Sequence, residues 1–154
     1  MAAADFDDFS IQLCELLSLE LPTLTCDEEG RRAFTITHRD TEFSFIERRS
    51  RRSENMSMLV KFGAPPSDKA AEVMANLMNA NFLMMQKGGA AFVQMPETGD
   101  IFLHRMTPLA QLHVPGVQAF LNKFADHVAR WSRDYFLDGA SRPANSEFGF
   151  ARLA

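Results

Sequence analysis

The stretch that decides the fold is residues 76–106, which read NLMNANFLMMQKGGAAFVQMPETGDIFLHRM. An apolar helix end runs into Gly88-Gly89, and glycine supplies the left-handed backbone that commonly ends a helix. Two short apolar runs follow at residues 90–95 and 101–106, joined by Pro-Glu-Thr-Gly-Asp, and they predict a β-hairpin. We expect these strands to share one apolar face, formed by Ala91, Val93, Met95, Ile101 and Leu103.

A long amphipathic helix is predicted after this hairpin. Pro115 suits the first turn of a helix, where its missing N–H costs nothing. Apolar residues then recur at spacings of three and four, a stripe formed by Val117, Leu121, Phe124, Val128, Trp131 and Tyr135. Such a stripe indicates a helix that buries one face, so we assign it to the core and not to a site.

The first half of the chain predicts a helix, three strands and a second helix. Apolar spacing gives the first helix over residues 5–19, and the polar residues 25–30 are interpreted as a loop. Period-two alternation then gives strands around residues 34–37, 42–45 and 56–62, and a second helix ends near Met85. The element order α-β-β-β-α-β-β-α predicts one α+β domain, residues 1–137, with a twisted, mainly antiparallel sheet packed with helices. Residues 138–154, rich in Gly, Ala, Ser and Pro, are expected to be a flexible tail.

Composition narrows the class of partner. The chain has 154 residues with 16 Lys+Arg against 20 Asp+Glu, and this net charge of −4 disfavours general binders of nucleic acid or anionic membranes. No basic leader and no long apolar segment is present, so we expect a cytoplasmic protein that does not insert into a membrane. A protein partner fits best.

The sequence offers no recognisable chemistry. The four histidines do not have metal-site spacing, Gly88-Gly89 does not continue into a phosphate loop, and Cys14 and Cys26 form no metal or redox motif. We therefore expect no catalytic residues, no metal and no cofactor. The charge run Arg48-Arg49-Ser50-Arg51-Arg52 is interpreted as a solvated loop, with an acidic partner segment as the next reading and RNA as the third.

The order of elements in residues 76–135 resembles the second half of a Tir chaperone (CesT) type protein. The resemblance rests on the helix, the Gly-Gly, the Pro-Glu-Thr-Gly turn between two strands and the long final helix, and the first half of the chain fits by pattern. The family comprises the small dimeric class I chaperones of bacterial type III secretion. It implies a homodimer that binds the N-terminal segment of a secreted effector and keeps it soluble and export-competent, without ATP hydrolysis. The secretion ATPase and export apparatus are further candidate partners.

Two sets of candidate site residues follow. The resemblance and the wide apolar stripe of the second helix assign dimerisation to Val73, Met74, Leu77, Met78 and Met85. By elimination, the Phe- and Met-rich first half is left to meet a partner. Its candidates are Phe6, Phe9, Leu13, Phe34, Phe43, Phe45, Met56 and Met58, of which some must be core because only one face of a strand can point outward.

Two other functional classes stay open at this stage. One is a sensor or adaptor of the same fold, similar to YbjN-like proteins, that acts in regulation and not in export. The other is a small enzyme with an unrecognised site, which a compact buried pocket with converging polar groups would favour.

Overall fold

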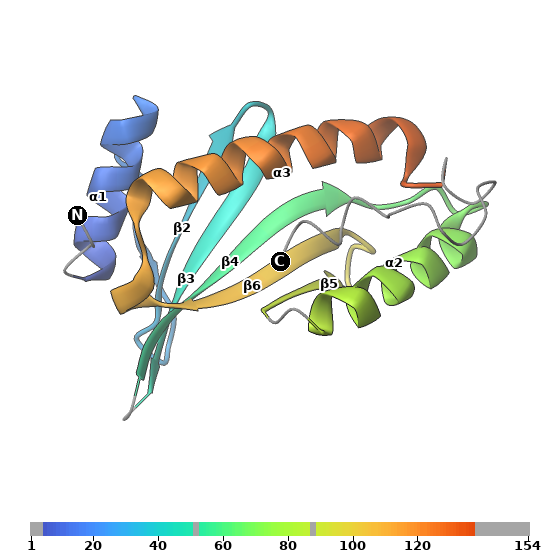
Figure 1. Cartoon of the computed structure of the whole chain (residues 1–154). Helices are drawn as coiled ribbons and strands as arrows, with labels where there is room; N and C mark the ends of the chain where they lie inside the picture. Colours follow the sequence, from blue (N-terminus) through green and yellow to red (C-terminus); the bar gives the residue numbers. More distant parts are fainter. Residues whose placement is uncertain (1–4, 51–52, 87–88, 138–154) are drawn as a thin grey trace.

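The computed structural model describes residues 5–50, 53–86 and 89–137 (Figure 1). The expected tail at 138–154, Gly88, and Arg51 and Arg52 of the arginine run lie outside the described residues. The elements, in chain order, are α1 (Phe6–Leu17), β1 (Thr25–Cys26), β2 (Arg32–His38), β3 (Thr41–Ser50), β4 (Ser53–Gly63), α2 (Ala70–Met85), β5 (Ala90–Gln94), β6 (Ile101–Pro108), the 3-10 turn η1 (Leu109–Gln111) and α3 (Val114–Asp134).

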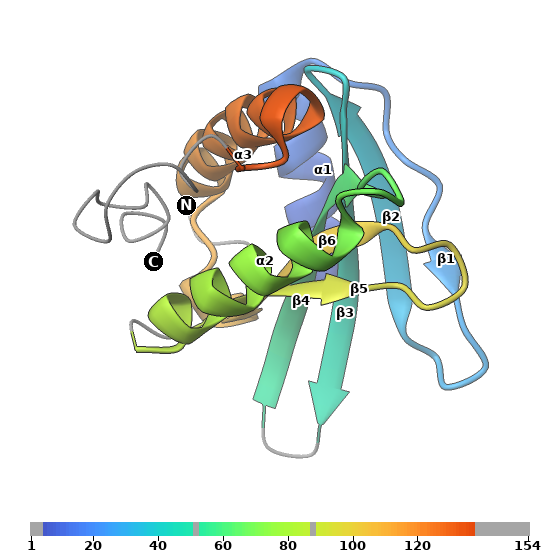
Figure 2. The ribbon, with the colours of Figure 1, turned by 90° about the vertical axis from the view of Figure 1, so that its right-hand side faces the viewer.

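Within the described residues, the strands form one antiparallel sheet in the order β1-β2-β3-β4-β6-β5. Helices α1 and α3 pack on the same face, because Phe9 of α1 meets Phe45 and Trp131 of α3 meets Phe62, and both strand residues point to that face. Helix α2 lies alongside β5 (Figure 2). These findings confirm the α+β class predicted from the sequence.

Helix α1 forms where the local signals predict it. Asp5 caps its N-terminus by accepting a hydrogen bond from the backbone N–H of Asp8, and Ser18, with φ of 55°, ends it in left-handed backbone. The apolar stripe buries Phe6, Phe9, Leu13 and Cys14. Burial raises the pKa of the Cys14 thiol, which keeps this cysteine a neutral core residue. None of the helices in the described residues is long and apolar enough to span a bilayer.

Strands β2 and β3 are joined by a two-residue turn. Arg39 and Asp40 both have positive φ, 50° and 59°, and the pair His38–Thr41 closes the hairpin. Two central residues with positive φ are typical of a type I′ turn, whose twist matches that of the flanking strands. The turn fixes the register that places Phe34 opposite Phe45 and Ile36 opposite Phe43.

Three expectations need correction. Residues 25–30 are not all loop, because Thr25–Cys26 pairs with β2 as a strand. This strand has two residues, too few for an apolar alternation that would predict it. Arg48 and Arg49 are not in a loop either: they pair with Asn55 and Glu54 inside the β3–β4 hairpin. The core face of β5 carries Phe92, opposite Leu103, whereas Val93 points to the other face.

The two edges of the sheet differ. At one edge, the side chain of Asn81 in α2 binds both backbone groups of Phe92: its amide donates to the carbonyl oxygen at 2.9 Å, and the N–H donates to Oδ1 at 2.6 Å. At the other edge, β1 pairs only with Arg32 and Ala33. The outer side of β2 beyond Ala33 therefore pairs with no described strand.

Candidate functional site

All eight partner-binding candidates lie inside the protomer. Their side chains are at most 4% exposed. Phe34 stacks on Phe45 with ring centroids 4.8 Å apart, and Phe9 meets Phe45 edge-on at 5.5 Å. The eight residues face one another across the α1–sheet interface and the centre of the sheet: Phe6, Phe9, Leu13, Phe34, Phe43, Phe45, Met56 and Met58. A site made of these side chains would require the core to open, so partner-facing groups must be sought elsewhere.

The dimerisation candidates divide into two groups. Val73 and Leu77 are buried in the protomer core, and Met74 packs partly against it. Met78 and Met85, in contrast, are 69% and 74% exposed. The stripe of α2 is wide because one side of the helix covers the core and another side points to solvent.

An exposed apolar surface surrounds these two methionines. Phe82, one turn after Met78 and 64% exposed, was missed as a site residue although it belongs to the same stripe. The surface, which we call the α2–β5 patch, consists of Met78, Phe82 and Met85 on one side of α2 and of Val93 and Met95 in and directly after the neighbouring strand β5. Soluble monomers rarely expose so many large apolar side chains together, and such patches usually mark interaction sites.

The open edge of β2 presents unused backbone groups. The hydroxyl of Thr25 in β1 donates to the carbonyl oxygen of Ala33 at 3.2 Å, so the backbone of Ala33 faces outward. In antiparallel pairing, the backbone groups of alternate residues point to opposite neighbours. Thr35 and Thr37 therefore also direct their N–H and C=O groups outward, where no described strand receives them.

Two exposed apolar side chains lie on α1 and on the connection that leads from α1 to β1 at this edge of the sheet. Ile11 follows Asp7 by one helical turn, and Asp7 binds Arg32 of β2, so Ile11 lies on the flank of α1 that faces β2. Ile11 is 41% exposed, and Leu21, in the connection from α1 to β1, is 63% exposed. Sequence reasoning missed both because Ile11 lies off the main stripe and Leu21 lies outside the helix.

A polar network around the buried carboxylate of Glu47 connects α1 to the sheet. Glu47 of β3, whose side chain is 3% exposed, accepts two hydrogen bonds of 2.8 Å from the guanidinium of Arg32, which also binds Asp7 of α1. The bonds from Arg32, aided by its charge and that of Arg49, lower the pKa of Glu47, although burial opposes the shift. Glu47 therefore stays ionised, and the network positions α1 over β2 and β3.

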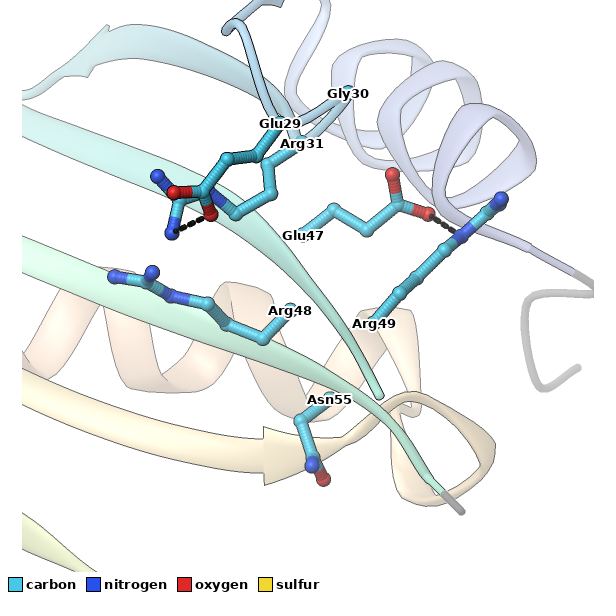
Figure 3. Close-up of a pocket in the computed structure, with 7 residues that line it drawn as sticks. All are labelled: Glu29, Gly30, Arg31, Glu47, Arg48, Arg49 and Asn55. Carbon is cyan, nitrogen blue, oxygen red and sulfur yellow. Dashed lines mark hydrogen bonds and ion pairs between the residues drawn. The ribbon is translucent and has the colours of Figure 1, made fainter. Parts of the chain in front are cut away.

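A cavity of about 280 Å³ lies where the connection between β1 and β2 approaches the end of β3 (Figure 3). Its arginines have partners among the described residues: Arg31 pairs with Glu29 at 3.0 Å and Arg49 with Glu47 at 2.7 Å. Arg48 donates to the hydroxyl of Ser57 at 3.4 Å. Arg31 and Arg49 are therefore already paired with carboxylates of the protomer, whereas the contact of Arg48 is to a hydroxyl, and the two ion pairs weaken the interpretation of this region as a receptor for an acidic segment.

The histidines and acidic residues form no metal centre in the part of the chain that the structure describes, where no group of three or more potential ligands comes together. His104 instead lies 3.1 Å from the hydroxyl of Ser57, and His38 lies 2.8 Å from the side-chain oxygen of Asn122. Burial, with a smaller contribution from Arg48, lowers the pKa of His104, so this ring is neutral at physiological pH.

Comparison with known proteins agrees with this architecture. The model of the Tir chaperone protein (CesT) family matches residues 12–132, from the middle of α1 to the end of α3. This chain belongs to the CesT family. A search of curated proteins finds no match.

A chain of one solved complex shares the fold of this CesT-family protein. The ExsC–ExsE complex contains a chain with a TM-score of 0.58 and 17% sequence identity, and the alignment covers 82% of this chain and 90% of that one. The HopA1–SchA chaperone–effector complex contains a chain with a TM-score of 0.49 and 17% identity, covering 81% of this chain and 88% of that one.

The family match spans both surfaces described above. It includes α2 and β5, with the α2–β5 patch, and it includes β2 with its open edge. Ile11 precedes the matched region by one residue. Apart from Ile11, both candidate surfaces of this CesT-family member therefore lie within the matched region.

Proposed function

We propose that this protein is a type III secretion chaperone that binds the N-terminal segment of a secreted effector in the bacterial cytoplasm. In this role it keeps the segment extended, soluble and export-competent. Membership of the CesT family supports the class of function. The observation that carries the binding mode is the open edge of β2, where Thr35 and Thr37 direct backbone groups outward beside exposed Ile11 and Leu21.

The segment binds by strand addition. An extended chain placed along β2 exchanges backbone hydrogen bonds with Thr35 and Thr37, which gives affinity with little dependence on sequence. Alternate side chains of the segment then point toward α1, where Ile11 and Leu21 supply apolar contact. No covalent bond forms or breaks, so the mechanism uses no catalytic residue and no cofactor.

Proline at position 35 tests strand addition. Thr35→Pro removes the outward N–H of β2 but leaves its bonds to β3, so we expect the affinity for the effector segment to fall about tenfold or more while the fold survives. The measurement is calorimetric titration with the N-terminal segment of a candidate effector. The candidate is a secreted protein that is encoded beside this chain and co-purifies with it.

Thr35→Val is the matched control, because it removes the same hydroxyl and keeps the N–H. We expect near wild-type affinity for this variant. Equal affinities for the proline, valine and wild-type proteins would contradict strand addition at β2. Failure of every tested effector segment to bind the wild type would contradict the proposed function itself.

We further propose that two copies associate through the α2–β5 patch. A two-fold interface uses the same surface twice, so Met78, Phe82 and Met85 of each copy would cover their counterparts and remove these side chains from water. Val73 and Leu77 would support the interface from within the protomer core without forming its surface.

A charge in the patch is expected to abolish the dimer. Phe82→Glu leaves the protomer core untouched but places an unpaired carboxylate at the centre of the interface, so light scattering should find a monomer at micromolar concentration. Leu21→Glu is the matched control: Leu21 is 63% exposed, like Phe82 at 64%, but lies outside the patch, and this variant should remain dimeric. A monomeric wild type would refute the dimer.

A further inference from the structure

Three arginines of the described residues stand over aromatic rings, and one of them differs from the others. Arg32 lies 5.7 Å from the ring centre of Phe6 and also binds Glu47 and Asp7. Arg130 lies 5.9 Å from the ring centre of Phe136 and pairs with Asp134 at 3.1 Å, its matched carboxylate on the same helix. In both cases the ring and an anion together hold the guanidinium.

Arg105 of β6 lies over an aromatic ring but, among the described residues, is not paired with a carboxylate. Its guanidinium lies 5.6 Å from the ring centre of Phe120, and no carboxylate of the described residues pairs with it. The arginine is only partly exposed, so its charge is less well hydrated than that of a fully exposed side chain. The position favours an incoming anion.

A cavity of about 230 Å³ opens beside this arginine, between β6 and the beginning of α3. Its walls are apolar at Met58, Leu112 and Phe120, and no aspartate or glutamate lines it. Gly116 lines the cavity and has room for a side chain, because a Cβ built there would meet nothing nearer than the Cβ of His113, at 4.0 Å. The cavity therefore combines the guanidinium of Arg105 and the polar side chains of Thr107, Gln111 and His113 with an apolar wall.

A second hollow continues this surface toward α1. It is lined by Gln12, Glu15 and Leu16 of α1 and by Val114 and Pro115 of α3, so both hollows include residues at the start of α3, and the carboxylate of Glu15 makes the second hollow unsuited to the acidic side chain itself. An extended peptide that passes the first turn of α3 would contact both hollows. One of its apolar side chains would pack against Leu16, and the side chains that follow would reach Arg105.

We propose that the Arg105 cavity receives an acidic side chain of the effector segment, with an apolar neighbour of that residue packed against Phe120 and Leu112. The inference rests on the proposed chaperone function and deepens it, because it names the chemistry that the effector must present. Arginine binds a carboxylate through two parallel hydrogen bonds, and a guanidinium already held over a ring loses little freedom on binding.

The test uses the full chain and the N-terminal effector segment that co-purifies with it. Arg105→Gln removes the charge and keeps much of the stacking, so we expect the affinity to fall about tenfold or more. Arg130→Gln is the control. Arg130 also lies over an aromatic ring, but it is already paired with Asp134, so its replacement should leave the affinity for the effector segment unchanged. Arg105→Lys should recover part of the loss, because it restores the charge without the planar fork.

A second variant blocks the cavity without touching Arg105. Gly116→Leu directs a side chain from α3 into the open space, and we expect a loss of affinity similar to that of Arg105→Gln, while Gly116→Ala should bind as the wild type does. A further set of synthetic effector segments has each Asp or Glu replaced in turn by Asn or Gln. One of these segments should bind the wild type more weakly, and its affinity should be the same for the wild type and for Arg105→Gln.

Each outcome separates this inference from the function on which it rests. Wild-type binding with no effect of Arg105→Gln or Gly116→Leu would overturn the acidic-residue proposal and leave the chaperone function standing. A change of oligomeric state in Arg105→Gln, with effector affinity unchanged, would assign the cavity to a second copy of this chain and also overturn the proposal. If the wild type bound no effector segment, the proposed chaperone function itself would be contradicted.

Discussion

Trp131→Ala is expected to lower the free energy of unfolding by about 3 to 5 kcal/mol, the usual cost of truncating a buried aromatic residue. The indole of Trp131 is buried and meets Phe62 of β4 at 5.8 Å, Phe136 at 5.3 Å and Tyr135 at 5.4 Å between ring centres. Its removal leaves a cavity between α3 and the sheet. Small domains have about 5 to 15 kcal/mol of stability in total, so the variant should be partly unfolded or close to it.

Urea denaturation of the wild type, Trp131→Ala and Trp131→Phe measures this effect. The phenylalanine variant retains an aromatic ring in the same space, so it should lose clearly less stability than the alanine variant. An alanine variant as stable as the wild type that nevertheless failed to bind effector would show that the end of α3 belongs to the binding site and not to the core.

Glu47→Gln is expected to cost about 3 kcal/mol of unfolding free energy, the lower end of the range for breaking a buried ion pair. The lower end applies because Arg32 is 22% exposed and keeps its contact with Asp7. Asp7→Asn is the control, since the Asp7 side chain is 49% exposed and an ion pair of this kind contributes about 1 kcal/mol or less. Thermal and urea denaturation would compare the two variants.

The cost of Glu47→Gln should depend on pH. The hydrogen bonds from Arg32 lower the pKa of Glu47 in the folded protein, so its carboxylate contributes stability above the pKa of an unfolded glutamate. This contribution disappears as the pH falls through the lowered pKa of the folded state. The difference in stability between the wild type and the glutamine variant should therefore be largest near neutral pH and should shrink in acid. A difference that grows in acid would contradict this account.

Much of the fold could be predicted from apolar periodicity. The stripe of α3 was assigned to the core, and the structure buries Leu121, Phe124 and Trp131. The β2–β3 hairpin and the strand β4 also follow from alternation. The two-residue β1 could not be predicted in this way, because a strand of this length shows no period.

The candidate partner-binding residues show what reasoning by elimination leaves out, because the structure buries all eight side chains in the protomer. It treated the apolar faces of α1 and of the first strands as surplus once α2 and α3 had been assigned. The two faces instead cover each other, with Phe6 5.4 Å from Phe34 between ring centres. Periodicity shows that a face is apolar but not what covers it, and the exposed Ile11 and Phe82 became visible only in three dimensions.

The contact between Asn81 and Phe92 has a consequence for assembly by strand pairing. A protein with two free edges could join its neighbours edge to edge and grow into filaments, a hazard of every exposed β-strand. Here the Asn81 side chain occupies the middle of the β5 edge, so growth in that direction has no template. A strand accepted at β2 therefore ends the sheet and does not extend a chain of protomers. This asymmetry leaves the β2 edge available to other polypeptides and excludes head-to-tail pairing of the β2 edge of one protomer with the β5 edge of the next.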